Sequence, residues 1–327
     1  SNTSRLSSSR TALSSSNGNS CVGCEMTPAQ SNKVLAKVAE ALRNQGMLNS
    51  SNLLNLMPKI VELVQKNLKE AELDQNGDQI TRVVKNMLGT LISKMNGKEA
   101  FMSPSSAEPG LTVQTTLLKQ ITSTSISNLG EAFETKHSSG RSNSKNHDRS
   151  ASALAKDAGS LIGAIVGSMG SSGMNVEDLS LTMKEVTGAA VASLENVDGM
   201  DSANLGDALK EITSEATAAI SQAIKDVKEN SSSSVSSDLI SSLVSSATSG
   251  ATEKIGEIDI PGFTSDDLSS MIENVTKGAT SGLGKMAAST DENIELSSLV
   301  SEISSSATES LDQIEMLGFD SEDLSSI

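Results

Sequence analysis

A seven-residue pattern recurs four times in the second half of the chain and constrains the fold more than any other feature. The pattern reads "GMNVEDL" (173–179), "GMDSANL" (199–205), "GFTSDDL" (262–268) and "GFDSEDL" (318–324), which align without gaps. Each copy has Gly, a large apolar residue, a small polar residue, two variable positions, Asp or Asn, and Leu. Small polar residues such as Asn, Asp or Thr are typical N-caps, because their side chains accept hydrogen bonds from free backbone N–H groups. Each copy therefore predicts the start of a helix.

The other positions of the pattern predict the details of each helix start. The Asp or Asn three residues after the cap can reach back to it, as in a capping box. The apolar residue before the cap can pack on the Leu as a hydrophobic staple. We assign the following residues to these helix starts and, through them, to contacts that support assembly: Met174, Asn175, Leu179, Met200, Asp201, Leu205, Phe263, Thr264, Asp267, Leu268, Phe319, Asp320, Asp323 and Leu324.

The spacing of these starts predicts a tandem array. Two further starts are expected at Leu239 and Leu296, and the six leucines are 26, 34, 29, 28 and 28 residues apart. The stretches between them carry apolar residues at helical spacing, and a single such helix cannot bury its own stripe. We therefore predict a mainly α protein in which residues 153–327 form an acidic array of roughly 28-residue helical repeats. The last repeat, which opens at 318, is incomplete.

Small residues lie in the middle of several repeats, and short links separate them. Gly188, Gly278 and Gly282 predict close approach of neighbouring helix backbones, since Gly in a helix otherwise costs roughly 1 kcal/mol relative to Ala. Links such as "GEIDIPGF" either form loops between stacked helices or contain short strands, because "EIDI" alternates with period two. A β/α solenoid is therefore the alternative to a helical array.

The first half of the chain predicts three further regions. Residues 1–26 are Ser-rich and without periodicity, as in a disordered tail. Three helical patterns with short links predict a three-helix bundle over 27–97, with Thr27 as N-cap and Pro28 at the first helical position. Residues 98–152 contain a helical pattern at 112–134 and then a polar, basic linker at 137–150, where we expect the main boundary.

Composition and charge limit the classes of function. The chain has no Trp, no Tyr and four Phe, so its core must consist of Leu, Ile, Val, Met and Ala. Residues 1–152 carry a net charge of +5, whereas residues 153–327 carry −21. This asymmetry favours attraction between copies or separate partners for the two halves. Nucleic acid is not expected as a partner of the acidic half, since binding phosphates requires clustered cations.

The repeats resemble a known style of sequence. "VTKGATSGLGKM" and "SATSGATEKIGEIDIPGFTSDDL" are similar to the tandem Ser/Thr/Gly/Ala-rich helical repeats of uncharacterised secreted proteins and lipoproteins of bacteria. The Ser-rich helical style also resembles silk and egg-case proteins, although those usually contain little Lys or Glu. The bacterial resemblance implies a protein outside the cell or at its surface, with a Cys near the mature N-terminus for lipid attachment.

Few residues suggest chemistry. Cys21 and Cys24 form the only cysteine motif, for which a disulfide, a lipid anchor or inert thiols are the alternatives. His137 and His147 are too far apart in the linker for a usual zinc site with these cysteines. "DQNGDQIT" (74–81) begins like a calcium loop but lacks Gly at its sixth position and Glu at its twelfth. We predict no catalytic, metal or cofactor site.

These patterns favour a non-enzymatic structural protein that associates with itself through its stacked helices. Such association is expected to weaken at high salt if the two halves attract one another. One alternative is a solenoid that binds another protein, and a second is a calcium-responsive extracellular protein. A membrane is expected as a partner only if a Cys carries lipid. The closing "GFDSEDLSSI" is expected to dock on the array of its own or a neighbouring molecule, with Phe319 and Leu324 as joining residues.

Overall fold

The described part of the molecule is helical, with no strand among its residues. The computed structural model describes residues 28–44, scattered positions between 59 and 86, 111–137, 144–172, 174–197, 200–230, 236–258, 263–290, 295–311 and Ile314. The helices are α1 (Pro28–Asn44), α4 (Val113–His137), α5 (Ser144–Met169), α6 (Val176–Ala192), η4 (Ser193–Asn196), α7 (Ser202–Asn230), α8 (Ser237–Ile255), α9 (Ser265–Ser289) and α10 (Leu296–Leu311).

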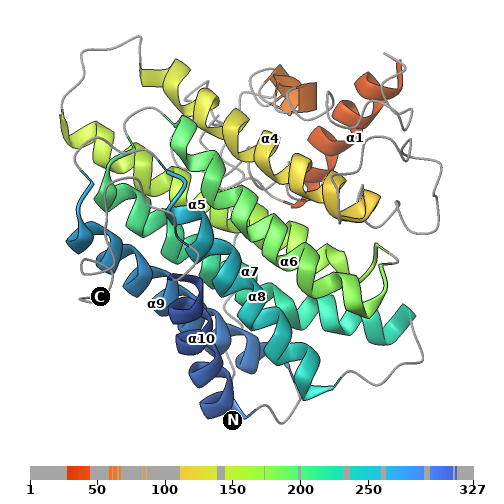
Figure 1. Cartoon of the computed structure of the whole chain (residues 1–327). Helices are drawn as coiled ribbons and strands as arrows, with labels where there is room; N and C mark the ends of the chain where they lie inside the picture. Colours follow the sequence, from red (N-terminus) through yellow and green to blue (C-terminus); the bar gives the residue numbers. More distant parts are fainter. Residues whose placement is uncertain are drawn as a thin grey trace, which may run out of the picture.

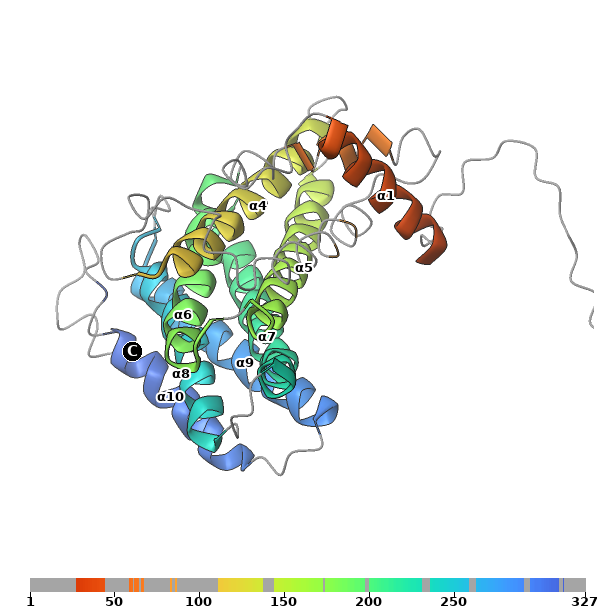
Figure 2. The same ribbon diagram turned by 90° about the vertical axis from the view of Figure 1, so that its right-hand side faces the viewer.

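The long helices form two rows (Figures 1 and 2). Helices α5, α7 and α9 pack side by side in one row, and α4, α6, α8 and α10 pack side by side in the other. Consecutive helices therefore lie in opposite rows, and each helix packs chiefly on the helix two places away in the chain. Figure 2 shows the rows as two columns, with α4 and α5 at one end and α9 and α10 at the other. The predicted mainly α fold is confirmed for the described residues, whose long helices form a two-row stack.

Neighbours within a row run parallel. Thr115, Lys119 and Ser123 of α4 contact residues 182, 185 and 193 of α6 and η4, respectively, so both numbers rise together. The hydrogen bonds within the rows join residues 61 to 71 positions apart. Two successive helices thus make one step of the stack.

The sequence patterns mark the starts of these helices. Asn175 and Asp201 lie before α6 and α7, and their side chains accept from the backbone N–H groups of residues 178 and 204 at 2.7 and 2.8 Å. Thr264 caps α9 in a complete capping box with Asp267. Ser236 caps α8, where the pattern is degenerate, by accepting from the Leu239 N–H. The copy at 318–324 lies outside the described residues.

The core contains many hydroxyl groups as well as aliphatic side chains. Thr122, Ser125 and Thr248 are buried, and their hydroxyls donate to the carbonyl oxygens four residues earlier in their own helices. A buried hydroxyl that donates to the backbone in this way satisfies its hydrogen-bonding need without a partner from another helix. Ser and Thr can therefore be buried beside the aliphatic side chains of the core.

The first half of the chain differs in part from expectation. Helix α1 begins at Pro28, as predicted, but most of 45–110 lies outside the described residues, so the three-helix bundle remains a prediction. Helices α4 and α5 belong to the two rows, which therefore start before residue 153. Helix α5 begins at Ser144, inside the segment 137–150 that the sequence predicts to be a linker without structure. The apolar part of α5 packs on α7, and the helix continues from that part toward the N-terminus through several polar residues.

The buried apolar residues make one connected core. It runs from Val34 and Val38 of α1 through all the long helices to Ile314. Of the proposed strand "EIDI", Glu257 lies in a turn and Ile258 has no regular structure, while the rest lies outside the described residues. The described residues thus support the helical form of the prediction.

Candidate association surface

The contacts between α7 and α9 show how one helix of a row accepts the next. A Cβ built at Gly282 of α9 would lie against the Ser214 carbonyl oxygen and 2.6 Å from Thr217 Cβ of α7. A Cβ at Gly278 would meet the Lys210 carbonyl oxygen in the same way. Only Gly fits at such distances, so the backbones of α7 and α9 lie in close contact there. The predicted close approach of Gly278 and Gly282 is confirmed.

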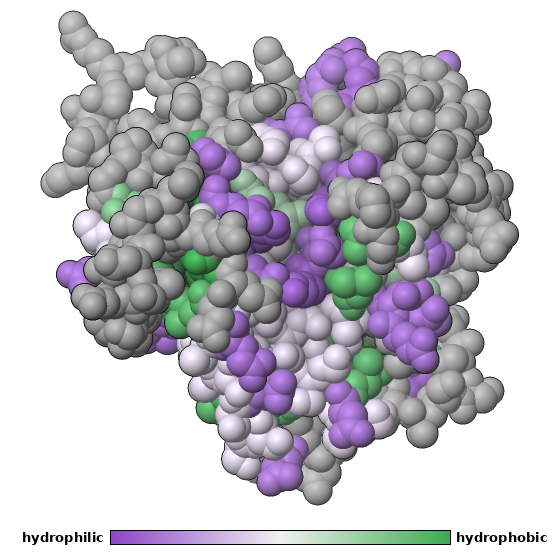
Figure 3. All heavy atoms as spheres, viewed as in Figure 1, coloured by the Kyte–Doolittle hydropathy of each residue, from purple (hydrophilic) through white to green (hydrophobic). Residues whose placement is uncertain are grey.

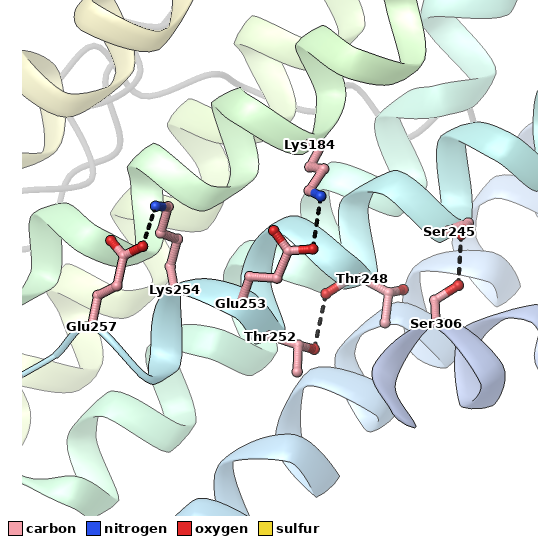
Figure 4. A network of polar contacts seen from close by, with 8 residues as sticks. All are labelled: Lys184, Ser245, Thr248, Thr252, Glu253, Lys254, Glu257 and Ser306. Atoms are coloured by element: carbon pink, nitrogen blue, oxygen red, sulfur yellow. Dashed lines mark hydrogen bonds and ion pairs between the residues drawn. The ribbon is translucent and has the colours of Figure 1, made fainter. Parts of the chain in front are cut away.

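Hydroxyl pairs and ion pairs join neighbours within each row. Ser245 of α8 and Ser306 of α10 lie 2.6 Å apart, oxygen to oxygen, and Thr115 and Thr182 make a similar pair at 2.7 Å between α4 and α6. The Lys184 ammonium of α6 lies 2.7 Å from the Glu253 carboxylate of α8 (Figure 4). Hydroxyl groups both donate and accept, so such pairs form between two copies of the same residue type.

The first turn of α9 also contacts α7. The Thr264 side chain, which donates to the Asp267 carboxylate at 2.6 Å, is the main cause that lowers the pKa of Asp267 below its ordinary value of 3.8. The side chain of Ser202, the first residue of α7, hydrogen-bonds to the same carboxylate and lowers the pKa further. Asp267 thus contacts two helices. Its carboxylate accepts hydrogen bonds from Thr264 at the start of α9 and from Ser202 at the start of α7.

The outer face of α9 repeats the chemistry of the α7 face that accepts α9. Leu205 and Leu268 occupy the same place in the seven-residue pattern and differ by 63 positions. With this offset, Thr213 and Thr217, which contact α9, correspond to Thr276 and Thr280 on α9. We call the outer face of α9 the open face. Its residues are Ser269, Glu273, Thr276, Lys277, Thr280, Ser281 and Gly284, and all of them are exposed except Thr276, which is half-buried.

Helix α10 adds an apolar stripe at the same end of the molecule. Leu296 and Val300 are 41 % and 40 % exposed and are the exposed large hydrophobic side chains in the described part of the chain. They are four residues apart and so lie on one side of α10. In Figure 3 the lower part of the molecule, where α9 and α10 lie in Figure 1, is mainly pale, with several purple areas and small green ones. This end thus presents mostly small and weakly polar side chains to solvent.

The opposite end of the stack is covered. No residue of α4 between 114 and 130 whose burial is described is exposed, and Leu118, Ile121, Ile126 and Leu129 are almost fully buried. Figures 1 and 2 place α1 at this end, beside α4. The buried residues of the N-terminal part, among them Val34, Ile60 and Val83, belong to the same core. The row of α4, α6, α8 and α10 is therefore covered at its α4 end.

The sequence-assigned residues mostly face the interior of their own molecule. Leu179, Leu205 and Leu268 are buried, and Met174, Met200 and Phe263 are partly buried against the core. Their caps lie at helix starts. Phe319, Asp320, Asp323 and Leu324, like Cys21 and Cys24, lie outside the described residues, so their assigned roles remain predictions. The open face was not predicted; the 63-residue offset between alternate pattern copies is the signal that identifies it.

The described residues offer little to other kinds of site. A small pocket between α5, α6, α7 and α8 is lined by apolar side chains such as Met169, Met183 and Leu243, and has no polar group to orient a substrate. The described His, Cys, Asp and Glu residues form no cluster suited to a metal ion. In the same residues, every helix is too short or too polar to cross a lipid bilayer.

Comparisons with known proteins give little similarity. No protein-family model matches the chain, and no curated protein matches it. Among solved structures, one match is described as "Computational Design of Self-Assembling Cyclic Protein Homooligomers". It is 15% identical, with a TM-score of 0.35, and the alignment covers 88% of this chain and 94% of that one. A likeness at this TM-score establishes neither a shared fold nor a shared function.

Proposed function

We propose that this protein is a non-enzymatic assembly protein that associates with copies of itself through the open face of α9 and the Leu296–Val300 stripe of α10. The observation that carries the proposal is the correspondence between the open face and the α7 face that accepts α9. A face built to accept a parallel helix within the stack is here left to solvent. Leu296 and Val300 of α10 add exposed apolar surface at the same end of the molecule.

The nature of the open face distinguishes this proposal from association through opposite charges. Its charged residues, Glu273 and Lys277, pair with each other at 2.6 Å and so leave no net charge. Contacts of small, hydroxyl and apolar side chains are not screened by salt, whereas attraction between a basic half and an acidic half is. Association through the open face is therefore expected to persist at high salt.

Sedimentation velocity of the full chain over a wide range of concentrations tests the proposal. We expect oligomers at low and high salt, and their loss in Val300→Glu, which places a charge on the apolar stripe. Ala203→Glu adds the same charge at an exposed position of α7 and is expected to leave the oligomers intact. Circular dichroism checks that each variant is folded. A monomer at every concentration, or equal effects of the two variants, would refute the proposal.

A further inference from the structure

We infer that the assembly is a closed dimer with two-fold symmetry, in which the open face of one copy packs on the open face of a second copy. This inference rests on the proposed function and specifies its partner surface. Self-association can be head-to-tail, which joins two different surfaces and extends into filaments, or two-fold, which joins the same surface on both copies and closes. The structure bears on this choice because its two ends differ.

Head-to-tail growth would require an accepting or donating face at both ends of the stack. At the α9–α10 end such a face is present. At the other end, the described side chains of α4 are all buried or half-buried, and among those described between 153 and 169 of α5 only Lys156 is exposed. Apolar residues of the N-terminal part share the core at that end. Among the surfaces of the described helices, the second copy therefore finds the open face on the first and offers the same surface in return.

The open face is also self-complementary, as a two-fold contact requires. The Thr280 hydroxyl donates to the Thr276 carbonyl oxygen of its own helix at 2.8 Å and can still accept, so it can pair with the Thr276 hydroxyl of the second copy as donor. The Ser245–Ser306 and Thr115–Thr182 pairs show that this protein joins helices in that manner. Each copy brings one acidic and one basic side chain, Glu273 and Lys277, so that apposed faces can match opposite charges.

The small residues of the open face permit close packing. Gly284 has no atom within 4 Å of the position of a Cβ, so its backbone is open to solvent, whereas Gly278 and Gly282 are closed by α7. Both the inner and the outer face of α9 thus carry glycine, but only the inner glycines are covered by another helix. Continuity with the α7–α9 contact is the reason to expect a helix of a second copy, rather than an extended peptide, against α9.

Cross-linking at a single cysteine tests the two-fold arrangement. In full-length protein with Cys21→Ser and Cys24→Ser, Thr280→Cys places one thiol on the open face. Residues near a two-fold axis face their own copies, so a short bismaleimide linker is expected to give covalent dimers and nothing larger. Ala203→Cys, exposed on α7, is the matched control and is expected to cross-link only at background level.

A charge at the same position gives an independent measure. Thr280→Glu would oppose two like charges across the axis, and we expect the dimer Kd to rise on the order of a hundredfold. Multi-angle light scattering of the parent protein is expected to give the mass of two chains. Filaments or higher oligomers without Thr280→Cys cross-links would overturn the closed dimer while leaving self-association in place.

Two further results would overturn the inference in other ways. A monomer at all concentrations would refute the proposed function along with the dimer. If the chain's own residues after Ile314 occupied the open face, the Thr280→Cys thiol would react slowly with maleimide in dilute monomer. Fast labelling of the monomer, followed by protection on association, is the result that the two-fold contact predicts.

Discussion

The two ends of the stack show how the same kind of helix behaves with and without a neighbour. Leu118 of α4 is fully buried, whereas Leu296 of α10 is 41 % exposed, although each belongs to the terminal helix of the same row. Repeat arrays need a terminal element that covers the last apolar face. Here the N-terminal part of the chain meets this need at one end. At the other end, the residues that remain exposed are small enough, and polar enough, to be tolerated in solvent.

The difference teaches that exposure here follows position in the stack rather than residue type. Thr217 of α7 is fully buried against α9, whereas Thr280, its counterpart on α9, is exposed. Sequence repeats make successive helices alike, but only the interior helices obtain neighbours on both sides. An exposed face on a terminal helix is thus a direct consequence of building a protein by repetition.

The largest expected effect on the free energy of unfolding comes from truncating Leu118, and truncating Leu296 gives the comparison. Leu118→Ala is expected to cost about 2–5 kcal/mol of unfolding free energy, because it removes a fully buried side chain and leaves a cavity. Leu296→Ala is expected to cost no more than about 1 kcal/mol, since much of its surface is already in contact with water. Urea denaturation at low protein concentration, where association does not contribute, measures both values. Equal losses would show that the two ends are packed alike.

The glycines of α9 give a sharper contrast within one helix. Gly282→Ala is expected to destabilise the protein by about 1–3 kcal/mol, since the added methyl would collide with Ser214 and Thr217 of α7. Gly284→Ala is expected to stabilise it by up to about 1 kcal/mol, because the methyl meets no atom and Ala favours the helix. Thermal melts of dilute protein give the sign of each change. Destabilisation by Gly284→Ala would mean that the outer side of α9 is covered.

Much of the helical architecture could be predicted from the sequence, because helix starts depend on local chemistry. The caps at Asn175, Asp201 and Thr264 need only their own first turns, and the glycines at 278 and 282 signal close contact wherever they pack. The extension of α5 back to Ser144 was not predicted, since its polar first turns carry no apolar periodicity. From its sequence alone, such a polar stretch cannot be told apart from a linker.

The association surface could not be predicted from any single repeat. Thr280 differs from Thr217 only in lacking a neighbour, and the presence of a neighbour depends on which helices share a row. Successive helices alternate between the two rows because each packs chiefly on the helix two places away, as α9 does on α7. This choice of neighbour depends on the tertiary structure and not on the sequence of one repeat. The pairing of Ser245 with Ser306 depends on the same alternation. The serines of one repeat therefore could not be assigned their partners from the sequence.

The smallest expected effect concerns the capping box at the open end. Helix α9 has a row neighbour on one side only, so its start depends on Thr264 and Asp267 together with the bond from Ser202. Because these hydrogen bonds lower the pKa of Asp267 below 3.8, the folded state favours the charged carboxylate. The contribution of Asp267 to stability is thus fully present above pH 3.8 and is lost as the pH falls through the lower folded-state pKa.

Asp267→Ala is therefore expected to cost about 1 kcal/mol at neutral pH and less in acid, where the parent protein has also lost the charge. Asp266→Ala, which removes an acidic residue from the same turn but not from the capping box, is the matched control. It is expected to cost only a few tenths of a kcal/mol, through the helix dipole. Urea denaturation of both variants at neutral pH and below pH 3.8 measures the difference. A gap between them that did not narrow in acid would show that Asp267 acts through packing rather than through its charge.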